Sequence, residues 1–141
     1  MISVLIVDDH PIVLEESKTF FGDNDILIET EQNATDVLSK MINTHFDVFL
    51  LDVNMAVQNG LSLAADIKAV QEQALIILYT GDDIQSYYPF IVDKKVDGIL
   101  SKTSSREKVI QTIRSLVQGD LILSFDFINY IITKMQYNYN S

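Results

Sequence analysis

The feature that most constrains the fold of this chain is a regular alternation of short apolar runs with longer amphipathic segments. The first run, Ile2–Val7, is rich in valine and isoleucine, which is typical of a strand buried on both faces. It ends at Asp8 and Asp9. A segment with helical periodicity then starts near Pro11, a residue suited to the first turn of a helix, and ends near Gly22. One buried strand followed by one helix is the repeating unit of parallel sheets.

The same unit recurs to the end of the alternation. Further strands are expected at residues 26–29, 46–51, 74–79 and 98–101, and helices at 34–42, 61–70, 83–93 and from 104 to about 119. Asn33 is expected to cap the helix at 34–42, and the sequence SSRE from Ser104 to Glu107 resembles a capping box. Alternation with short connections requires right-handed crossovers and helices on both faces of the sheet. The predicted fold class is α/β, a doubly wound five-stranded parallel sheet.

Length and composition suit one domain with a short extension. The chain has 141 residues, of which 48% are hydrophobic, so it can bury a core and is not a disordered chain. We expect a domain at residues 1–119 and a C-terminal helical extension or linker start at 120–141. No apolar run approaches the roughly 18 residues that cross a bilayer, so no membrane association is expected. The absence of cysteine excludes disulfides and thiolate chemistry, and it fits a cytoplasmic location.

The net charge argues against nucleic-acid binding by this segment. Twenty acidic and 10 basic residues give a formal charge of -10, which would repel a phosphate backbone. We therefore expect no direct DNA binding. The acidic residues are spread along the chain, so any functional use of them requires a local cluster.

Polar residues follow four of the five predicted strands. Asp8 and Asp9 follow the first, Asp52 the third, Thr80 the fourth and Lys102 the fifth. In open α/β sheets the ligand lies beyond the carboxyl ends of the strands, so these side chains should converge. Each residue alone is often structural, because aspartates cap helices and lysines are usually solvated. The combination of these residue types at the ends of four strands favours a functional site.

The residue types indicate phosphoryl chemistry with a divalent cation. Three clustered carboxylates repel one another unless a cation neutralises them, and oxygen ligands favour Mg²⁺. With a metal to polarise phosphoryl oxygens, the Asp52 carboxylate could act as a nucleophile and form an aspartyl phosphate. Lys102 would then supply a positive charge to the phosphate, and the Thr80 hydroxyl a hydrogen bond.

With these residues identified, the chain resembles the receiver domain of bacterial two-component response regulators from residue 4 to about residue 119. The matching motifs are VDD at residues 7–9, LDVNM at 51–55, Gly60, YTG at 79–81 and LSK at 100–102. The resemblance implies a flavodoxin-like (βα)5 fold with strand order 2-1-3-4-5. It also implies a signalling protein, not an enzyme, that takes part in its own phosphorylation and dephosphorylation.

The resemblance assigns a role to each matching residue. Asp9, the Asp52 carboxylate and the Asn54 main-chain carbonyl would bind Mg²⁺ directly, with Asp8 helping through water. Asp52 would take phosphate from the phosphohistidine of a sensor histidine kinase. The new charge would draw Thr80 inward and bias a surface formed by the fourth helix, fifth strand and fifth helix.

The resemblance extends to phosphate lifetime and assembly. Asn54 and Asp82 occupy positions that tune the rate of phosphate loss in the family. A homodimer is possible through the surface of the fourth helix, fifth strand and fifth helix, or through the C-terminal helix. Ile99 stands where many members have an aromatic residue, so the usual aromatic switch coupled to Thr80 cannot operate in its familiar form. Ala56 and Thr103 replace two frequent prolines.

The C-terminal segment has its own pattern. VQG at 117–119 with residues 121–124 resembles LuxR/NarL-type receivers, which carry a helix-turn-helix DNA-binding domain that this sequence lacks. A shortened chain that controls transcription through a missing domain is favoured over a stand-alone receiver. Ser124 could cap a helix with an apolar stripe that packs on the domain or binds a partner. The stripe is Ile128, Ile131, Ile132 and Met135.

Two other functions are alternatives to the receiver. A phosphatase of the haloacid-dehalogenase type also uses aspartate, lysine, threonine and Mg²⁺ on such a sheet, but it needs a second aspartate where Asn54 stands, because an amide cannot act as general acid. A phosphorylation-independent dimerisation module with a vestigial acidic site is the other alternative. The intact set of polar residues argues against it.

Overall fold

The computed structural model describes residues 1–120 and 125–140 and contains a five-stranded parallel sheet. The strands are β1 (Ile2–Val7), β2 (Ile26–Glu31), β3 (Val48–Asp52), β4 (Leu75–Thr80) and β5 (Gly98–Ser101). Their order in the sheet is β2-β1-β3-β4-β5, and all four neighbouring pairs are parallel. The predicted fold class and strand order are confirmed.

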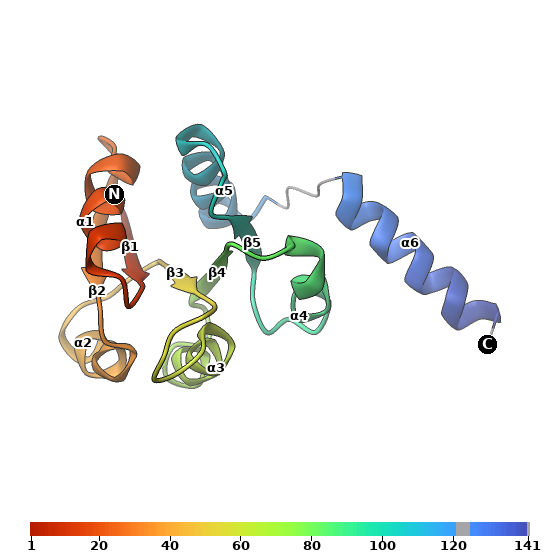
Figure 1. Ribbon diagram of the computed structural model, residues 1–141, viewed down its shortest axis with the longest axis horizontal. Coiled ribbons are helices and arrows are strands. Elements are labelled where there is room, and N and C mark those ends of the chain that lie inside the picture. The colour runs from red at the N-terminus through yellow and green to blue at the C-terminus, as the bar shows by residue number, and fades with distance from the viewer. Residues whose placement is uncertain (121–124, 141) are drawn as a thin grey trace.

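Helices cover both faces of the sheet (Figure 1). They are α1 (Pro11–Phe21), α2 (Val37–Asn43), α3 (Gly60–Val70), α4 (Tyr88–Val92), α5 (Arg106–Gln118) and α6 (Phe125–Asn140), with 3-10 turns at Ala34–Asp36 and Ile84–Tyr87. In Figure 1, α1 and α5 lie on one side of the sheet, while α2, α3 and α4 lie on the other. This is the doubly wound arrangement that the alternation predicts.

The central strands β1, β3 and β4 are buried on both faces, which explains their continuous apolar sequence. Alternate side chains such as Leu5 and Phe49 join a core under α2 and α3. Their neighbours, such as Ile6 and Leu50, join a second core under α1 and α5. Each fully buried aliphatic side chain contributes about 1.5–3 kcal/mol, so these two cores fix the positions of the strand ends.

Helix starts differ in detail from the expected ones. Ser105 caps α5, since its side chain accepts a hydrogen bond from the Lys108 N–H, so the capping box expected to begin at Ser104 is wrong by one residue. Asn33 stands at the expected position but makes no side-chain cap bond, and the helix after it begins as a 3-10 turn. Asn59 caps α3 by accepting from the Ser62 N–H.

The segment predicted as one irregular helix at 83–93 is divided in two. A 3-10 turn at Ile84–Tyr87 passes into the short α4, which has a proline in its first turn. Lys94, just after α4, has a φ of 60°, a left-handed conformation that stops the helix. This irregular connection places the consecutive residues Tyr87 and Tyr88 differently: Tyr87 is partly exposed, and Tyr88 is buried.

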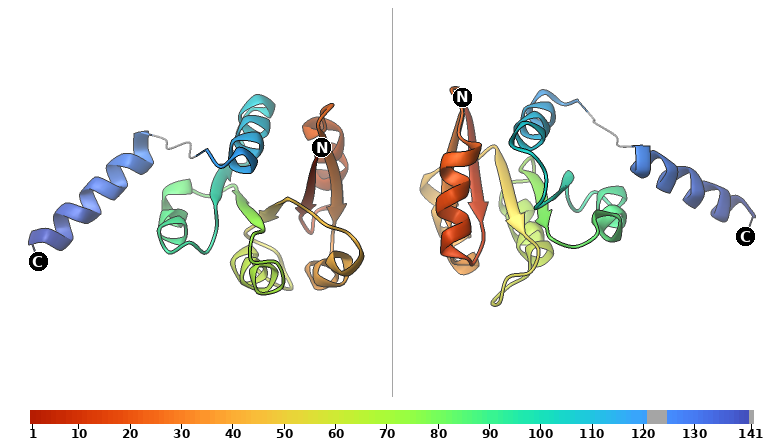
Figure 2. Two further views of the ribbon diagram at one scale, coloured as in Figure 1. Left: turned by 180° about the vertical axis from the view of Figure 1, so that it is seen from behind. Right: turned by 45° about the horizontal axis from the view of Figure 1, so that its top comes forward.

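Helix α6 extends away from the end of the domain formed by α4 and α5 (Figure 2). It meets the domain through Phe127, which is buried, and Tyr130, and both rings contact Tyr88 at centroid distances of 5.0 and 5.5 Å.

Most of the apolar stripe predicted on this helix does not pack on the domain. Ile128, Ile132 and Met135 are 39%, 47% and 66% exposed, and Ile131 is partly buried. Packing was therefore the wrong interpretation for most of the stripe. The cap expected at Ser124 and the motif at 121–124 lie outside the described residues. Among the described residues, no helix is long and apolar enough to cross a membrane.

Candidate functional site

Two buried carboxylates form the base of the site. Asp8 directly follows β1 and Asp52 is the last residue of β3, and these neighbouring strands pair in register through Val7 and Leu51. Asp8 is 1% exposed and Asp52 3% exposed. The Asp8 backbone N–H donates to the carbonyl of Glu31, which extends the β1–β2 pairing by one residue and fixes the Asp8 backbone.

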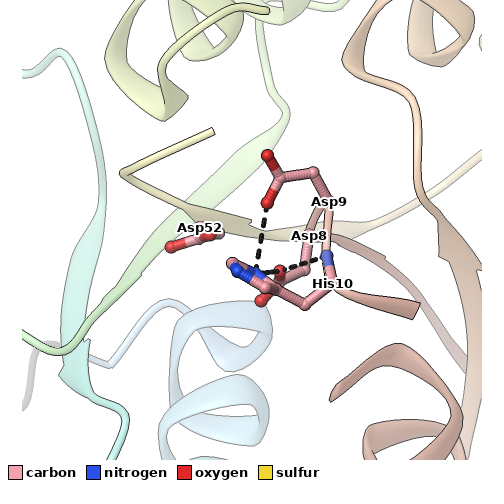
Figure 3. Close-up of side chains that lie close together, drawn as sticks. All are labelled: Asp8, Asp9, His10 and Asp52. Atoms are coloured by element: carbon pink, nitrogen blue, oxygen red, sulfur yellow. Dashed lines mark hydrogen bonds and ion pairs between the residues drawn. The ribbon is translucent and has the colours of Figure 1, made fainter. Parts of the chain in front are cut away.

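Asp9 and His10 complete a compact cluster at this edge. One ligand atom each from Asp8, Asp9, His10 and Asp52 lies within 4.8 Å of the other three. Figure 3 shows the His10 ring between the carboxylates of Asp8 and Asp9. Its Nδ1 lies 2.8 Å from Asp8 Oδ1 and 3.1 Å from Asp9 Oδ1. The hydrogen bond to Asp8 and the charges of both carboxylates raise the pKa of His10 above its ordinary value.

Lys102 brings a positive charge to the buried carboxylates. Its Nζ lies 3.1 Å from Asp52 Oδ1 and 3.5 Å from Asp8 Oδ2. Burial lowers the pKa of Lys102, but the hydrogen bond to Asp52 and the charges of Asp8 and Asp52 outweigh that effect and raise the pKa above its ordinary value. The lysine is therefore a fixed cation at neutral pH. Its backbone N–H donates to the Thr80 carbonyl, which ties it to the end of β4.

One oxygen of Asp52 is available to a ligand. Oδ1 faces Lys102 and accepts a long hydrogen bond, 3.4 Å, from the Asn54 N–H. Oδ2 is buried and has no hydrogen-bond partner within residues 1–120 and 125–140. A buried oxygen left without a partner costs free energy, and a site with such an atom is suited to an incoming group.

The donor set fits Mg²⁺. Carboxylate oxygens from Asp8, Asp9 and Asp52 converge, and oxygen ligands without sulfur suit a hard cation. Asp9 is held in place because its Oδ2 accepts a hydrogen bond from the Ala56 N–H. The Asn54 carbonyl stays a predicted ligand. The Asn54 side chain is directed elsewhere, since its Nδ2 donates to Asp82 Oδ2 at 3.2 Å.

Thr80 connects this edge to the loop after β4. Thr80 is fully buried, and its Oγ1 accepts a hydrogen bond of 2.9 Å from the Asp82 N–H. The Tyr87 hydroxyl donates to Asp82 Oδ2 at 2.9 Å. The hydrogen bonds from Tyr87 and Asn54 lower the pKa of Asp82, while burial and the bond to Asp82 raise the pKa of Tyr87. Asp82 thus joins Thr80, Asn54 and Tyr87.

The expected residues therefore gather at the carboxyl edge of the sheet. Asp8, Asp9, Asp52 and Lys102 form one cluster, and Thr80 lies beside it, at the end of the strand next to β3. Reasoning from the sequence did not find His10 or Tyr87. The position of His10, directly after the acidic pair, was a usable signal.

The model of the response regulator receiver domain matches residues 4–114. This chain belongs to the response regulator receiver family.

Curated relatives of this receiver are longer response regulators. Transcriptional regulatory protein ComA of Bacillus subtilis is 30% identical over 147 residues, which cover 96% of this chain and 65% of ComA. The nitrate/nitrite response regulator protein homolog of Haemophilus influenzae is 27% identical and is matched over 94% of this chain and 65% of its own length. The receiver thus spans just under two thirds of these relatives.

Solved receiver structures share the fold. The response regulator TrrA of Thermotoga maritima, in complex with Mg²⁺-BeF, has a TM-score of 0.72 and 26% identity over 82% of this chain and 99% of its own. A LuxR-family response regulator of Aurantimonas has a TM-score of 0.80 over 94% of this chain and 96% of its own, and its 20% identity supports the fold alone.

Proposed function

We propose that this receiver accepts a phosphoryl group on Asp52 and thereby switches an output surface. The observation that carries the proposal is the buried, unpartnered Oδ2 of Asp52 beside the Lys102 cation. A carboxylate oxygen with no competing hydrogen bond is available as a nucleophile. The nearby cation and the Thr80 hydroxyl offer charge and hydrogen bonding to the phosphate that results.

The proposed reaction is a direct phosphoryl transfer. An Asp52 oxygen attacks the phosphorus of a phosphohistidine on a sensor histidine kinase. The new O–P bond forms as the N–P bond breaks, and the electron pair of that bond returns to the imidazole nitrogen, which then takes up a proton. Lys102, held between Asp52 and Asp8, stabilises the negative charge that gathers on the transferred group.

Asp8, Asp9 and Asp52, with the Asn54 carbonyl, are the proposed holders of Mg²⁺. When bound, the ion would offset the charge of the carboxylates and polarise the phosphoryl oxygens. The chain's own residues arrange this site: β1 and β3 place the two buried carboxylates, and the Ala56 N–H orients Asp9.

The wider role is that of a cytoplasmic regulator of transcription. The support is the likeness to ComA, a transcriptional regulatory protein, and the net charge of -10, which opposes DNA binding by this segment itself. A further domain would contact DNA. The proposed dimer surface is α4, β5 and α5, or α6.

Intact mass spectrometry tests the proposal. The chain is incubated with Mg²⁺ and a small acyl phosphate, with Asp52→Ala and the exposed loop variant Glu72→Gln as comparisons. We expect one phosphate adduct on the wild type and on Glu72→Gln, and none on Asp52→Ala. An equal adduct on Asp52→Ala would place the acceptor elsewhere. Turnover of unrelated phosphomonoesters would indicate a phosphatase.

A phosphorylation-independent dimerisation module is the second candidate. The exposed apolar side chains of Ile128, Ile132 and Met135 on α6 favour it, because such a stripe at helical spacing suits a partner helix. It predicts no adduct on the wild type and a dimer whose dissociation constant is unchanged by acyl phosphate. Sedimentation of treated and untreated protein measures that constant.

A further inference from the structure

Two consecutive tyrosines connect the acidic site with the C-terminal helix. Tyr87, at the end of the 3-10 turn, donates to Asp82 Oδ2 at 2.9 Å. Tyr88, the first residue of α4, contacts the rings of Phe127 and Tyr130 on α6. The two residues share a peptide bond at the junction of two short helical turns, so a shift of Tyr87 can be passed to Tyr88.

Asp82 connects Tyr87 to Thr80, which lies at the proposed phosphate site. The Asp82 N–H donates to Thr80 Oγ1, and the Asp82 carboxylate accepts from Tyr87. If the Thr80 hydroxyl turns to a phosphate on Asp52, the Asp82 N–H loses its acceptor, and the loop that carries Asp82 is free to shift. Tyr87 follows, because its hydroxyl is bound to that carboxylate.

At the other end of this connection, Tyr88 lines a groove of about 200 Å³ between α4, β5 and α5. Tyr88, Ile99 and Phe127 are among the residues that line it. Ile99 is only partly buried and belongs to the apolar group that also contains Tyr87. A side chain of α6 therefore lines the same groove as Ile99, which stands where many receivers have an aromatic ring.

The buried Tyr88 makes the docking of α6 sensitive to small shifts. Tyr88 is 3% exposed, and its hydroxyl has no hydrogen-bond partner within residues 1–120 and 125–140. Its contacts with Phe127 and Tyr130 are edge-to-face, with interplanar angles of 81° and 61°, and such contacts depend on orientation. Among residues 125–137, Phe127 is the one large apolar side chain that is buried, so its ring makes the deepest contact of this helix with the domain.

We infer that Tyr87 and Tyr88 relay the state of the phosphate site to α6, with Tyr87 as the positioning residue and Phe127 as the group released. The inference rests on the proposed phosphorylation of Asp52. In the unphosphorylated protein, Thr80, Asp82 and Tyr87 hold α4 in the place that lets Tyr88 dock Phe127. Phosphorylation breaks the first bond of this series, and α6 leaves the groove, which uncovers Phe127 beside the stripe that is already exposed.

Hydrogen exchange measured by mass spectrometry tests the relay on the full chain. Tyr87→Phe removes the hydroxyl and keeps the ring that lies 6.2 Å from Phe90. Tyr137→Phe, which removes a hydroxyl from a residue that is 73% exposed, is the matched control. Phe127→Ala gives the exchange rate of a released helix. Far-UV circular dichroism verifies the fold, and intact mass gives the phosphorylated fraction of each sample.

For the wild type and Tyr137→Phe, we expect phosphorylation to speed exchange in residues 125–137 by about threefold or more, towards the rate of Phe127→Ala. Tyr87→Phe should take up phosphate yet show no such change. If Tyr87→Phe responds like the wild type, or if α6 of the phosphorylated wild type exchanges at the unphosphorylated rate, the relay is wrong while the phosphoacceptor proposal stands. If the wild type takes up no phosphate, both proposals fall.

Discussion

Gly60 lies directly against the backbone of Asp52: a Cβ at this glycine would be 2.6 Å from the Asp52 carbonyl oxygen. The Gly60 N–H also donates to the Val53 carbonyl at 3.0 Å, so the start of α3 rests on the end of β3. Any side chain at position 60 must push β3 and α3 apart.

We therefore expect Gly60→Ala to destabilise the protein by about 1–3 kcal/mol, the usual cost of overpacking. Urea unfolding measures the change. Gly81→Ala is the matched control, because a Cβ at Gly81 would meet no atom within 4 Å. Equal effects of the two substitutions would contradict a specific clash at Asp52.

Magnesium should stabilise the folded protein through Asp9. Binding to the native state alone adds about 1.4 kcal/mol to the free energy of unfolding for each tenfold rise in Mg²⁺ above its dissociation constant. We expect the urea midpoint to rise with Mg²⁺ and to return when the metal is removed with a chelator. Asp9→Asn should lose most of this dependence, whereas Glu72→Gln, at an exposed loop residue, should retain it. If the urea midpoint of Asp9→Asn depends on Mg²⁺ as strongly as that of the wild type, the Asp9 carboxylate is not a ligand of the metal.

Lys102→Met should destabilise the protein in the absence of metal. The substitution leaves Asp8 and Asp52 buried without their cation, which costs about 1–3 kcal/mol once the 30% exposure of the lysine side chain is allowed for. Mg²⁺ should recover part of the loss, since it offsets the same charges. Denaturant unfolding with and without Mg²⁺ measures both effects. Lys18→Met, at an exposed lysine of α1, should show neither.

Arg114 should make stability depend on pH. On α5, it bonds Asp23 at 2.7 Å and Asp25 at 3.0 Å, in the turn before β2. These bonds lower the pKa of both carboxyls from the ordinary 3.8. A lowered folded-state pKa gives stabilisation that is present above the ordinary pKa and lost as pH falls through the lowered one.

Arg114→Gln should therefore unfold at a lower urea concentration than the wild type at pH 7. This gap between the two urea midpoints should close as the pH falls below about 4. Added salt should narrow the gap at pH 7, because the three groups are partly exposed. A gap that persists unchanged at low pH would show that lost packing, and not charge, is responsible.

The sequence predicted the architecture because each buried strand is a continuous apolar run. Once strands and helices alternate, parallel strand ends must share one edge, so Asp8, Asp52, Thr80 and Lys102 could be brought together without side-chain detail. Ser105 shows the limit of local reasoning: two adjacent serines can each cap a helix, and only the backbone decides between them.

The rest depended on packing that a pattern does not encode. Tyr87 reaches Asp82 because a 3-10 turn precedes α4, and the sequence of this turn has no clear period. Periodicity on α6 correctly indicated an amphipathic helix, but it does not name the surface that the helix meets. The helix docks through Phe127, outside the stripe that the period selects.

The ion pair between Lys102 and Asp8 joins residues 94 positions apart in the chain. During synthesis the acidic residues leave the ribosome long before the lysine, and β5 must join the sheet before the cation reaches them. A nascent chain therefore displays clustered carboxylates without their partner. The charge balance of this site is therefore completed last, as the final strand is added to the sheet.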